Sequence, residues 1–335
     1  MDPNSNNSSR RQIVGGTGLG LAMSAAAASP APAQGQAPAP AAQPLQNPAE
    51  KYPRPPYKRQ SQPWPGLAGK MDPRPDHGET SYRGSGRLAG RKALVTGGDS
   101  GMGRAAAIAF AREGADVAIN YLPDEEPDAR EVIAFIQEAG RKGVAIPGDL
   151  RDPAFCRRMV EEAVRGLGGL DILVNNAARQ QTRPSVLDVS DEDFDATMKT
   201  NIYAPFWTIK AALPHMPPGS AIIGTTSEQA YDPSPDLYDY AQTKAATMNY
   251  VKSLAKQLAP KGIRVNGVAP GPIWTPLQVS GGATMEKLEK FGGQTPLGRA
   301  GQPAELGSIY VQLAAADASF ATGQVYGSAG GGGQP

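Results

Sequence analysis

The chain of 335 residues is 40% hydrophobic and 19% charged, which is enough for a sizeable core in one large or two small domains and too apolar for a disordered polyelectrolyte. Its 33 basic and 32 acidic side chains nearly cancel and form no polybasic run, so the sequence gives no indication of nucleic-acid binding. A single cysteine, Cys156, excludes a disulfide framework, and with only two histidines no metal site is expected.

Residues 1–33 have the order of an export signal. Arg10 and Arg11 precede a weakly apolar stretch rich in Ala and Gly, and Ala31-Pro32-Ala33 provides a small-residue cleavage site. Because paired arginines before such a stretch are typical of twin-arginine signals, we expect export to the periplasm with cleavage after Ala33. The alternative is a disordered tail on a cytoplasmic protein. No run of about 20 strongly apolar residues occurs, so no membrane span is expected.

Proline is concentrated in the first quarter of the chain, where 14 of the 32 prolines precede Arg87. Residues 34–49 combine it with Ala and Gln, which predicts a flexible linker. Residues 50–86 add aromatic side chains without any helical or strand periodicity. This combination favours an extended arm that lies on a folded surface, and the alternative is an unbound linker. The aromatic residues in question are Tyr52, Tyr57, Trp64 and Tyr82.

Strand and helix patterns alternate from residue 87 to residue 330. Apolar and β-branched runs predict strands at 92–96, 116–121, 143–147, 171–175, 220–225, 263–269 and 323–326. The stretches between them predict helices at 102–113, 128–139, 153–166, 191–213, 238–258 and 303–315. Alternation at this spacing is typical of a doubly wound α/β domain, in which helices cover a parallel sheet, here of seven strands. Residues 331–335 are expected to form a short tail.

The first predicted strand runs into a glycine-rich turn and then into a helix. Glycines permit a tight turn and let the backbone approach a pyrophosphate, and the following helix presents free N–H groups and the positive end of its dipole. The turn therefore predicts a dinucleotide site. Its sequence is Thr96-Gly97-Gly98-Asp99-Ser100-Gly101-Met102-Gly103.

Tyr240 and Lys244 are four residues apart, so they share one face of the predicted helix. An ammonium group near a phenol lowers the pKa of the tyrosine, and a phenol is a suitable proton donor to a carbonyl or acceptor from an alcohol. Ser227 follows a predicted strand, where ligand sites gather, and its hydroxyl can hydrogen-bond a substrate oxygen. The alternative is that Tyr240 and Lys244 are a surface pair on an amphipathic helix.

The glycine turn, Thr-Gly-x-x-x-Gly-x-Gly, resembles that of the short-chain dehydrogenases/reductases, and further marks of this family follow in order between residues 87 and 330. Ala178 departs from the pattern, because the family usually has glycine there. Residues 51–56 and 71–79 resemble the N-terminal extension of one bacterial branch, which includes aldehyde reductases and glucose-dehydrogenase-like proteins. The further marks are Gly148-Asp149-Leu150, Asn175-Asn176-Ala177-Ala178, Asn201, Ser227, Tyr240-x-x-x-Lys244 and Pro270-Gly271 with Thr275.

This resemblance implies a single Rossmann domain and an NAD(P)-dependent oxidoreductase that transfers a hydride between the nicotinamide and an aldehyde, a ketone or a sugar or polyol. Tyr240 would be the general acid/base, acting with Ser227, Lys244 and Asn201, the last holding a water. A homotetramer is implied, and we expect the arm to pack across a subunit interface. Cofactor contacts are expected at Gly97, Asp99, Ser100, Gly101, Met102, Gly103, Asn120, Tyr121, Asp149, Leu150, Asn176, Ala177, Tyr240, Lys244, Pro270, Gly271, Ile273 and Thr275.

The choice between NAD and NADP depends on the end of the second predicted strand. That strand ends in Asn120-Tyr121, without the acidic residue that bonds the ribose 2′-hydroxyl of NAD, so NADP is slightly favoured. Asp99 adds negative charge nearby and no arginine takes the acidic position, which leaves both cofactors open. Trp274 is expected in the wall of the substrate pocket. The alternative function is a catalytically silent dinucleotide sensor or scaffold, although Ser227, Tyr240 and Lys244 are all intact.

Overall fold

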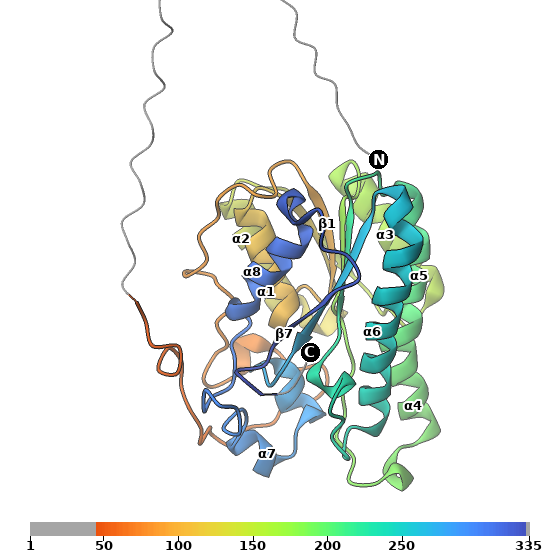
Figure 1. Ribbon diagram of the computed structural model, residues 1–335. Helices are drawn as coiled ribbons and strands as arrows, with labels where there is room; N and C mark the ends of the chain where they lie inside the picture. Colours follow the sequence, from red (N-terminus) through yellow and green to blue (C-terminus); the bar gives the residue numbers. More distant parts are fainter. Residues whose placement is uncertain (1–44, 333–335) are drawn as a thin grey trace, which may run out of the picture. The chain divides into compact units, whose positions relative to one another are not determined.

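The computed structural model describes residues 45–332. The expected export signal, nearly all of the linker and the end of the tail lie outside these residues. Within them, seven strands form one parallel sheet in the order β3-β2-β1-β4-β5-β6-β7 (Figure 1). The strands are β1 (Lys92–Thr96), β2 (Asp116–Tyr121), β3 (Gly143–Pro147), β4 (Ile172–Asn175), β5 (Ala221–Thr225), β6 (Arg264–Pro270) and β7 (Val325–Ser328).

The doubly wound α/β fold is confirmed. Strand order reverses between β1 and β4, and such a switch point opens a crevice at the carboxyl ends of the strands, where ligands bind in this architecture. Each central strand is buried on both faces, which explains why the predicted strands read as continuous apolar runs rather than as alternating ones.

Helices cover both faces of the sheet, as Figure 1 shows. Alternate residues of a strand point to opposite faces, so Val95 packs with one layer and Leu94 with the other. The first layer contains α1 (Gly101–Arg112), α2 (Glu126–Glu138) and α8 (Ala304–Ala314). The second contains α3 (Pro153–Leu167), α5 (Ala204–Ala212) and α6 (Tyr238–Leu258). No helix in the range 45–332 is both long and apolar enough to span a bilayer.

One predicted helix is interrupted. The stretch expected as a single helix at 191–213 consists of α4 (Asp191–Met198), a π-helical turn at Lys199–Tyr203 and α5. The π-helical turn contains one more residue per turn than an α-helix, and Asn201 lies within it. The buried side chain of Asn201 points toward α6. A short helix, α7 (Met285–Glu289), was not predicted.

From residue 46 onward the N-terminal segment, which includes the arm, packs against other parts of the same chain. Tyr57 and Met71 are buried against Trp274, Val279 and Leu288, which belong to the segment after β6. Backbone bonds join the two segments, from the amide of Tyr57 to the carbonyl of Glu289 and from that of Gln62 to the carbonyl of Val279, both at 2.9 Å.

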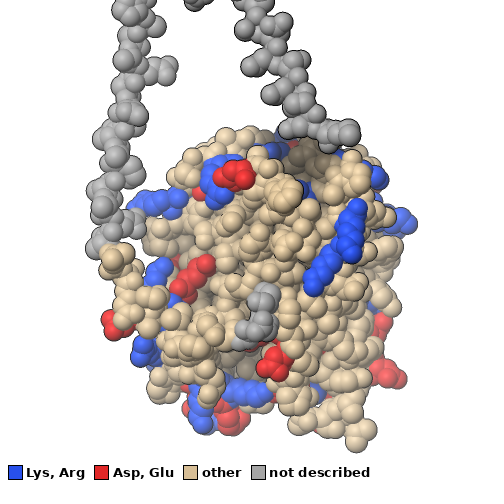
Figure 2. Space-filling view, viewed as in Figure 1, with Lys and Arg blue, Asp and Glu red and all other residues tan. Residues whose placement is uncertain are grey.

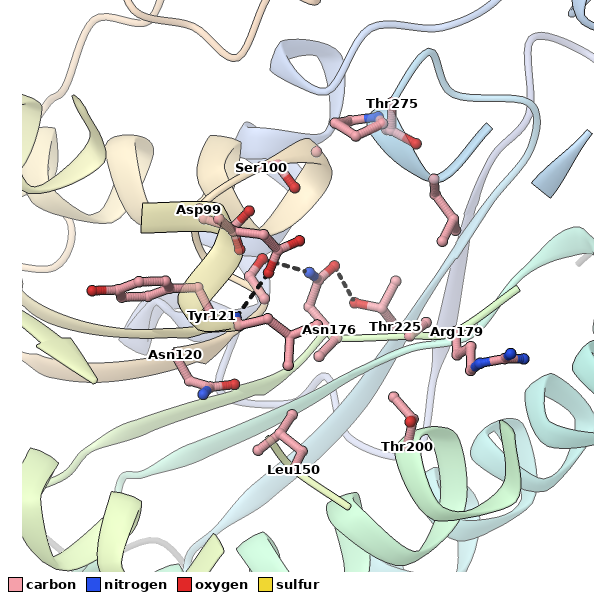
Figure 3. Close-up of a pocket in the computed structure, with 18 of the residues that line it drawn as sticks. Asp99, Ser100, Asn120, Tyr121, Leu150, Asn176, Arg179, Thr200, Thr225 and Thr275 are labelled. Atoms are coloured by element: carbon pink, nitrogen blue, oxygen red, sulfur yellow. Dashed lines mark hydrogen bonds between the residues drawn. The ribbon is translucent and has the colours of Figure 1, made fainter. Parts of the chain in front are cut away.

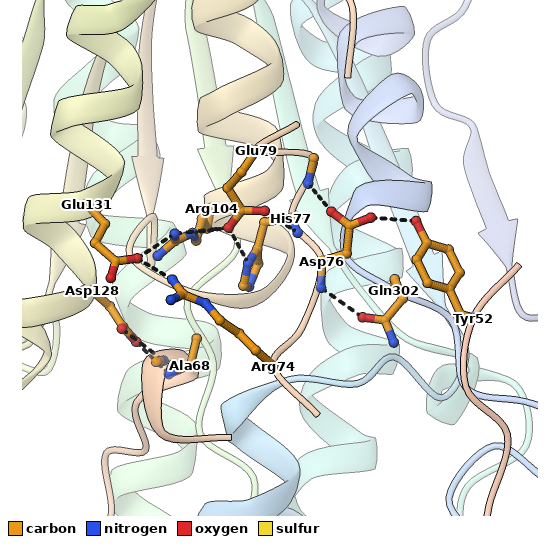
Figure 4. A network of polar contacts seen from close by, with 12 residues as sticks. Tyr52, Ala68, Arg74, Asp76, His77, Glu79, Arg104, Asp128, Glu131 and Gln302 are labelled. Carbon is orange, nitrogen blue, oxygen red and sulfur yellow. Dashed lines mark hydrogen bonds and ion pairs between the residues drawn. The ribbon is translucent and has the colours of Figure 1, made fainter. Parts of the chain in front are cut away.

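A polar network ties the arm to the first helix layer (Figure 4). The guanidinium of Arg104, in α1, is fully buried and contacts the carboxylates of Glu79 and Glu131 at 3.0 and 2.8 Å. His77 is buried beside Glu79, with Nδ1 3.0 Å from its carboxylate. At the other end of the network, the hydroxyl of Tyr52 donates to Asp76 at 2.6 Å. This network is a cluster of paired charges, whereas on the face drawn in Figure 2 the Lys and Arg side chains lie scattered among those of Asp and Glu.

Candidate active site

The glycine loop after β1 has the geometry of a pyrophosphate cradle. Gly97 and Gly101 adopt φ of +60° and +51°, in the left-handed region that favours glycine. A Cβ at Gly103 would lie 1.9 Å from the carbonyl oxygen of Gly97, so only glycine permits this approach of α1 to the loop. The first turn of α1 then presents its free N–H groups to the cavity beside Ser100 and Met102. These features fit a dinucleotide.

The end of β4 holds the loop in place (Figure 3). The side-chain amide of Asn176 donates to the carbonyl of Gly97 at 3.1 Å, while its carbonyl accepts from the hydroxyl of Thr225 at 3.3 Å. The hydroxyl of Thr96 accepts from the backbone amides of Asn176 and Ala177 at 3.0 and 3.2 Å. Asn176 thus bridges the glycine loop and β5, Ala177 bonds the end of β1, and both residues line the cavity.

The ends of β2 and β3 form the far end of the same cavity. The Asn120 side chain donates to the carbonyls of Ile146 and Gly148 at 3.2 and 3.1 Å, so its amide is used within the protein. The Tyr121 hydroxyl donates to Glu126 at 2.5 Å. Asp149 pairs with Arg151, whose guanidinium holds the pKa of the carboxyl below its usual range although partial burial acts against this. Leu150 supplies an apolar surface beside them.

The four residues expected to be catalytic are all buried, and hydrogen bonds hold α6 to the end of β5 and to the π-helical turn beside them. Lys244, one turn after Tyr240 in α6, has its ammonium 5.2 Å from the centre of the Tyr240 ring and donates to the carbonyl of Thr225 at 2.9 Å. The side-chain amide of Asn201 donates to the hydroxyl of Thr243 at 3.0 Å, and that hydroxyl donates to the carbonyl of Tyr240 at 2.7 Å. Ser227 caps the turn after β5 by accepting from an amide.

Burial dominates the electrostatics of this group. It raises the pKa of the Tyr240 hydroxyl above its usual range, and a hydrogen bond with Ser227 opposes the shift. It lowers the pKa of the Lys244 ammonium to about 7. The pKa of Tyr240 is thus raised in this structure, whereas the sequence predicted that Lys244 would lower it. A tyrosine that keeps its proton at neutral pH is suited to donate it to a carbonyl oxygen.

A second cavity adjoins the first on the side of Ser227. Tyr240, Met102 and Thr275 line both, so the Tyr240 side chain lies in their common wall. The predicted loop residues Pro270, Gly271 and Ile273 line the second cavity. Its other lining groups combine apolar side chains, among them Leu237, Leu277 and Phe291, with polar ones, which include Gln180, Glu228, Gln229, Ser234, Asp236 and Lys287.

Comparison with known proteins places these features in one family. Residues 97–332 match the family model described as enoyl-(acyl carrier protein) reductase. Over 287 residues the chain is 57% identical to an uncharacterized oxidoreductase, YghA, of Escherichia coli (strain K12), an alignment that covers 86% of this chain and 98% of that relative. The chain belongs to the short-chain dehydrogenase/reductase family. It is an NAD(P)-dependent dehydrogenase/reductase.

Two further members of the family are similar over most of the chain. The glucose and ribitol dehydrogenase of Daucus carota is 43% identical over 276 residues, covering 81% of this chain and 94% of that one. A crystal structure of a short-chain dehydrogenase from Burkholderia cenocepacia J2315 in complex with NADP superposes with a TM-score of 0.68 at 35% identity, covering 73% of this chain and 98% of that one.

In this short-chain dehydrogenase/reductase the two cavities gather all but two of the predicted site residues. Gly103 lies behind the loop, where its role is close packing, and Asn201 lies behind Tyr240. The side chain of Asn201 already bonds the backbone of Arg179 through both of its polar atoms. Its expected role in holding a water remains a prediction.

The pocket role expected for Trp274 is wrong. Its indole is fully buried, stacks on Tyr57 of the arm and donates to the carbonyl of Pro73 at 2.8 Å. Conversely, sequence reasoning missed Trp64 and Gly66, which bring the arm to the cofactor cavity, as well as Glu125 and Glu228. Burial raises the pKa of Glu228 to about 7, so this carboxyl beside Ser227 titrates near neutral pH.

Proposed function

We propose that the enzyme interconverts a carbonyl and an alcohol, with an aldehyde, a ketone or a sugar or polyol as its substrate, and that Tyr240 is its general acid/base. One observation carries the proposal: the Tyr240 side chain lies where the cofactor cavity and the second cavity adjoin, next to Ser227. A group at that junction can exchange a proton with the oxygen of a substrate that meets the cofactor there. The bound nicotinamide would supply or accept the hydride.

The residues around Tyr240 have separable roles in this proposal. The hydroxyl of Tyr240 passes its proton to the substrate oxygen during reduction and takes it back during oxidation. The hydroxyl of Ser227 donates to the same oxygen as negative charge develops on it. Lys244 and Asn201 position Tyr240 from behind, through the contacts of α6 with β5 and with the π-helical turn.

Polar side chains among the lining of the second cavity support a substrate that carries hydroxyl groups. The Glu228 carboxyl lines it beside Ser227, while Gln180 and Gln229 each keep one polar atom for a substrate after bonding Gly282 and Ser234 within the protein. The name of the carrot relative, a glucose and ribitol dehydrogenase, points the same way. The alternative, a catalytically silent sensor or scaffold, gives no role to Ser227 and Tyr240 beside a second cavity.

Steady-state kinetics on a panel of aldehydes, ketones, sugars and polyols, with both cofactors, tests the proposal. Tyr240→Phe removes one hydroxyl and should lower kcat by about 10²–10⁴-fold while leaving cofactor binding intact. Ser227→Ala should cost a similar amount. Tyr238→Phe, on an exposed position two residues earlier, is the matched control and should change nothing. Full activity of Tyr240→Phe, or binding of cofactor without turnover on any substrate of the panel, would contradict it.

We also propose that the enzyme is a homotetramer. Tyr203 and Phe206, at the end of the π-helical turn and the start of α5, expose 47% and 60% of their surface, and apolar side chains grouped in this way favour an interface between subunits. Tyr52, Tyr57 and Tyr82 contact their own chain, which leaves Trp64, 40% exposed, as the aromatic side chain that the arm would present to a partner. Light scattering should give the mass of four chains, and a monomer would end the proposal.

Export is the third element of the proposal, with residues 1–33 as a twin-arginine signal, 34–49 as a linker, 50–86 as the arm and 87–330 as the Rossmann domain. The arginine pair and the cleavage site support it. Mass spectrometry of the periplasmic fraction should find an N-terminus at Gln34, and Arg10→Lys with Arg11→Lys should stop export. Full-length chain confined to the cytoplasm would contradict it.

A further inference from the structure

Two acidic side chains that lie far apart in the sequence meet at one end of the cofactor cavity. Asp99 comes from the glycine loop after β1, and Glu125 comes from the short turn that precedes α2. The residues at the end of β2, Asn120, Tyr121 and Leu122, line the cavity with them. Figure 3 shows Asp99 and Tyr121 on the same side of the cavity. In doubly wound dinucleotide sites the ribose 2′-hydroxyl lies at the end of this second strand.

Asp99 has an unused hydrogen-bonding capacity. The residue is 1% exposed, and within residues 45–332 its Oδ2 atom has no hydrogen-bond partner. A buried carboxylate oxygen without a partner costs free energy that a donated hydrogen bond would recover. Glu125 is anchored beside it by the amide of Leu122, which donates to its carboxylate at 2.8 Å. The pair therefore presents acceptors, and a ribose hydroxyl is a donor.

The basic side chains that line this cavity, within the described part of the chain, are all engaged elsewhere. Arg151 is paired with Asp149, Arg179 is paired with Asp193, and the ammonium of Lys244 donates to a backbone carbonyl at the opposite end. A 2′-phosphate brought next to Asp99 and Glu125 would thus meet two carboxyl groups and no unpaired cation. Repulsion of the 2′-phosphate would favour the cofactor that lacks this phosphate as effectively as an added attraction for that cofactor.

We propose that Asp99 and Glu125 together recognise the ribose 2′-hydroxyl and make the enzyme prefer NAD over NADP, an inference that rests on the proposed function of the cavity as a cofactor site. It runs against the slight preference for NADP expected from Asn120. The acidic group that the second strand lacks is supplied instead by the neighbouring loop and by the turn before α2.

The charge of the pair changes in an accessible pH range. Burial raises the pKa of Asp99 to about 7, and burial together with the charge of Asp99 raises the pKa of Glu125 to about 9. The other charged groups facing them are Asp124 and Asp128, which favour the protonated forms, and Arg104, which opposes this but is already paired with Glu79 and Glu131. Between pH 7 and pH 9 the pair loses protons, so its repulsion of a 2′-phosphate dianion grows.

Isothermal titration with NAD and with NADP tests the inference without any substrate. The unmodified enzyme should bind NAD at least about tenfold more tightly than NADP, and the ratio of the Kd for NADP to the Kd for NAD should increase from pH 7 to pH 9. At pH 9, where Asp99 is ionised and Glu125 is partly ionised, Asp99→Asn and Glu125→Gln should each narrow the ratio, and the double variant should reduce it by about ten- to a hundredfold, because a hydrogen bond or contact with a charged group is worth about 1.5–3 kcal/mol. Glu138→Gln, at an exposed acid at the other end of α2, is the matched control and should leave the ratio unchanged.

Two outcomes would overturn the inference: equal or tighter binding of NADP by the unmodified enzyme, and a ratio that neither the variants nor pH alters. The pH series uses the unmodified protein, so it decides the question even where a variant fails to fold. If neither nucleotide binds, the proposed function itself is wrong. If both bind with the same affinity at every pH, only the role of Asp99 and Glu125 is wrong.

Discussion

The phenol ring of Tyr57 lies on the indole of Trp274, with ring centroids 4.3 Å apart and planes inclined by 22°. Tyr57 belongs to the arm, while Trp274 belongs to the loop after β6. The residues on either side of Trp274, Ile273 and Thr275, line the second cavity. The arm therefore packs behind a loop that lines the cavity proposed to hold the substrate.

Replacing Tyr57 with alanine should loosen that loop. Tyr57 is almost fully buried, and removal of a buried aromatic ring costs about 3–5 kcal/mol. We expect this loss of unfolding free energy in urea together with a raised KM for the substrate. Phe320→Ala, which removes a fully exposed ring, is the control and should change neither quantity. Equal effects of the two substitutions would show that the arm does not support the loop.

Arg104 should be the most sensitive charge in the network of Figure 4. Its guanidinium is fully buried between Glu79 and Glu131, and removing one partner of a buried pair leaves the others without compensation. Because Glu131 is partly exposed to water, we expect Arg104→Met to cost about 3 kcal/mol, at the lower end of the range for buried pairs. Arg130→Met, which breaks only an exposed pair with Glu126 in α2, should leave the free energy of unfolding nearly unchanged.

The sequence predicted those parts of the site whose geometry is local. Tyr240 and Lys244 share a helix face because they are one turn apart, and the glycine loop is a continuous segment between a strand and a helix. Asp99 and Glu125 are 26 residues apart and meet only because β1 pairs with β2. That meeting has no signature in either segment.

Trp274 shows the same limit of prediction from sequence, here for a residue that was predicted to line the pocket and does not. An indole in a loop next to an active site is as well placed to line a pocket as to support it, and the choice depends on what packs behind the loop. Here the arm does, more than two hundred residues earlier in the chain. The π-helical turn that carries Asn201 has no local signal either, because residues 191–213 form a continuous helical pattern.

Gly103→Ala should show which of two opposing effects prevails at this position, the higher helix propensity of alanine or the close packing of α1 on the glycine loop. In an open helix this change stabilises by about 1 kcal/mol, since alanine is the better helix former. Here the new methyl group would lie 1.9 Å from the carbonyl oxygen of Gly97 and 2.6 Å from the side-chain nitrogen of Asn176, so the glycine loop must move. We expect binding of both nucleotides to be lost in titrations.

The control for this change is Gly332→Ala, where the nearest atom to an added Cβ is 3.6 Å away. It should leave nucleotide binding and thermal stability unchanged. Normal binding by Gly103→Ala would show that the loop does not cradle the pyrophosphate.

Lys244→Met should make the enzyme less active and more stable at the same time. Burial lowers the pKa of Lys244 from its usual 10.5 to about 7, so the folded state binds a proton less readily than the unfolded chain does. Between pH 7 and pH 10.5 the Lys244 side chain binds more protons in the unfolded chain than in the folded enzyme. The contribution of Lys244 to the free energy of unfolding therefore rises with pH across this window. Methionine fills a similar volume without that cost.

Urea unfolding at pH 6.5 and pH 10 measures the difference. At pH 6.5 we expect Lys244→Met to be about 2 kcal/mol more stable than the unmodified enzyme, which is less than the full pKa shift implies because the bond to the carbonyl of Thr225 is lost. At pH 10 the advantage should nearly vanish. Activity and cofactor affinity should fall at both pH values, as is common where a strained buried group serves function. A variant that is both inactive and less stable at pH 6.5 would show instead that Lys244 has a structural role in holding α6 against β5.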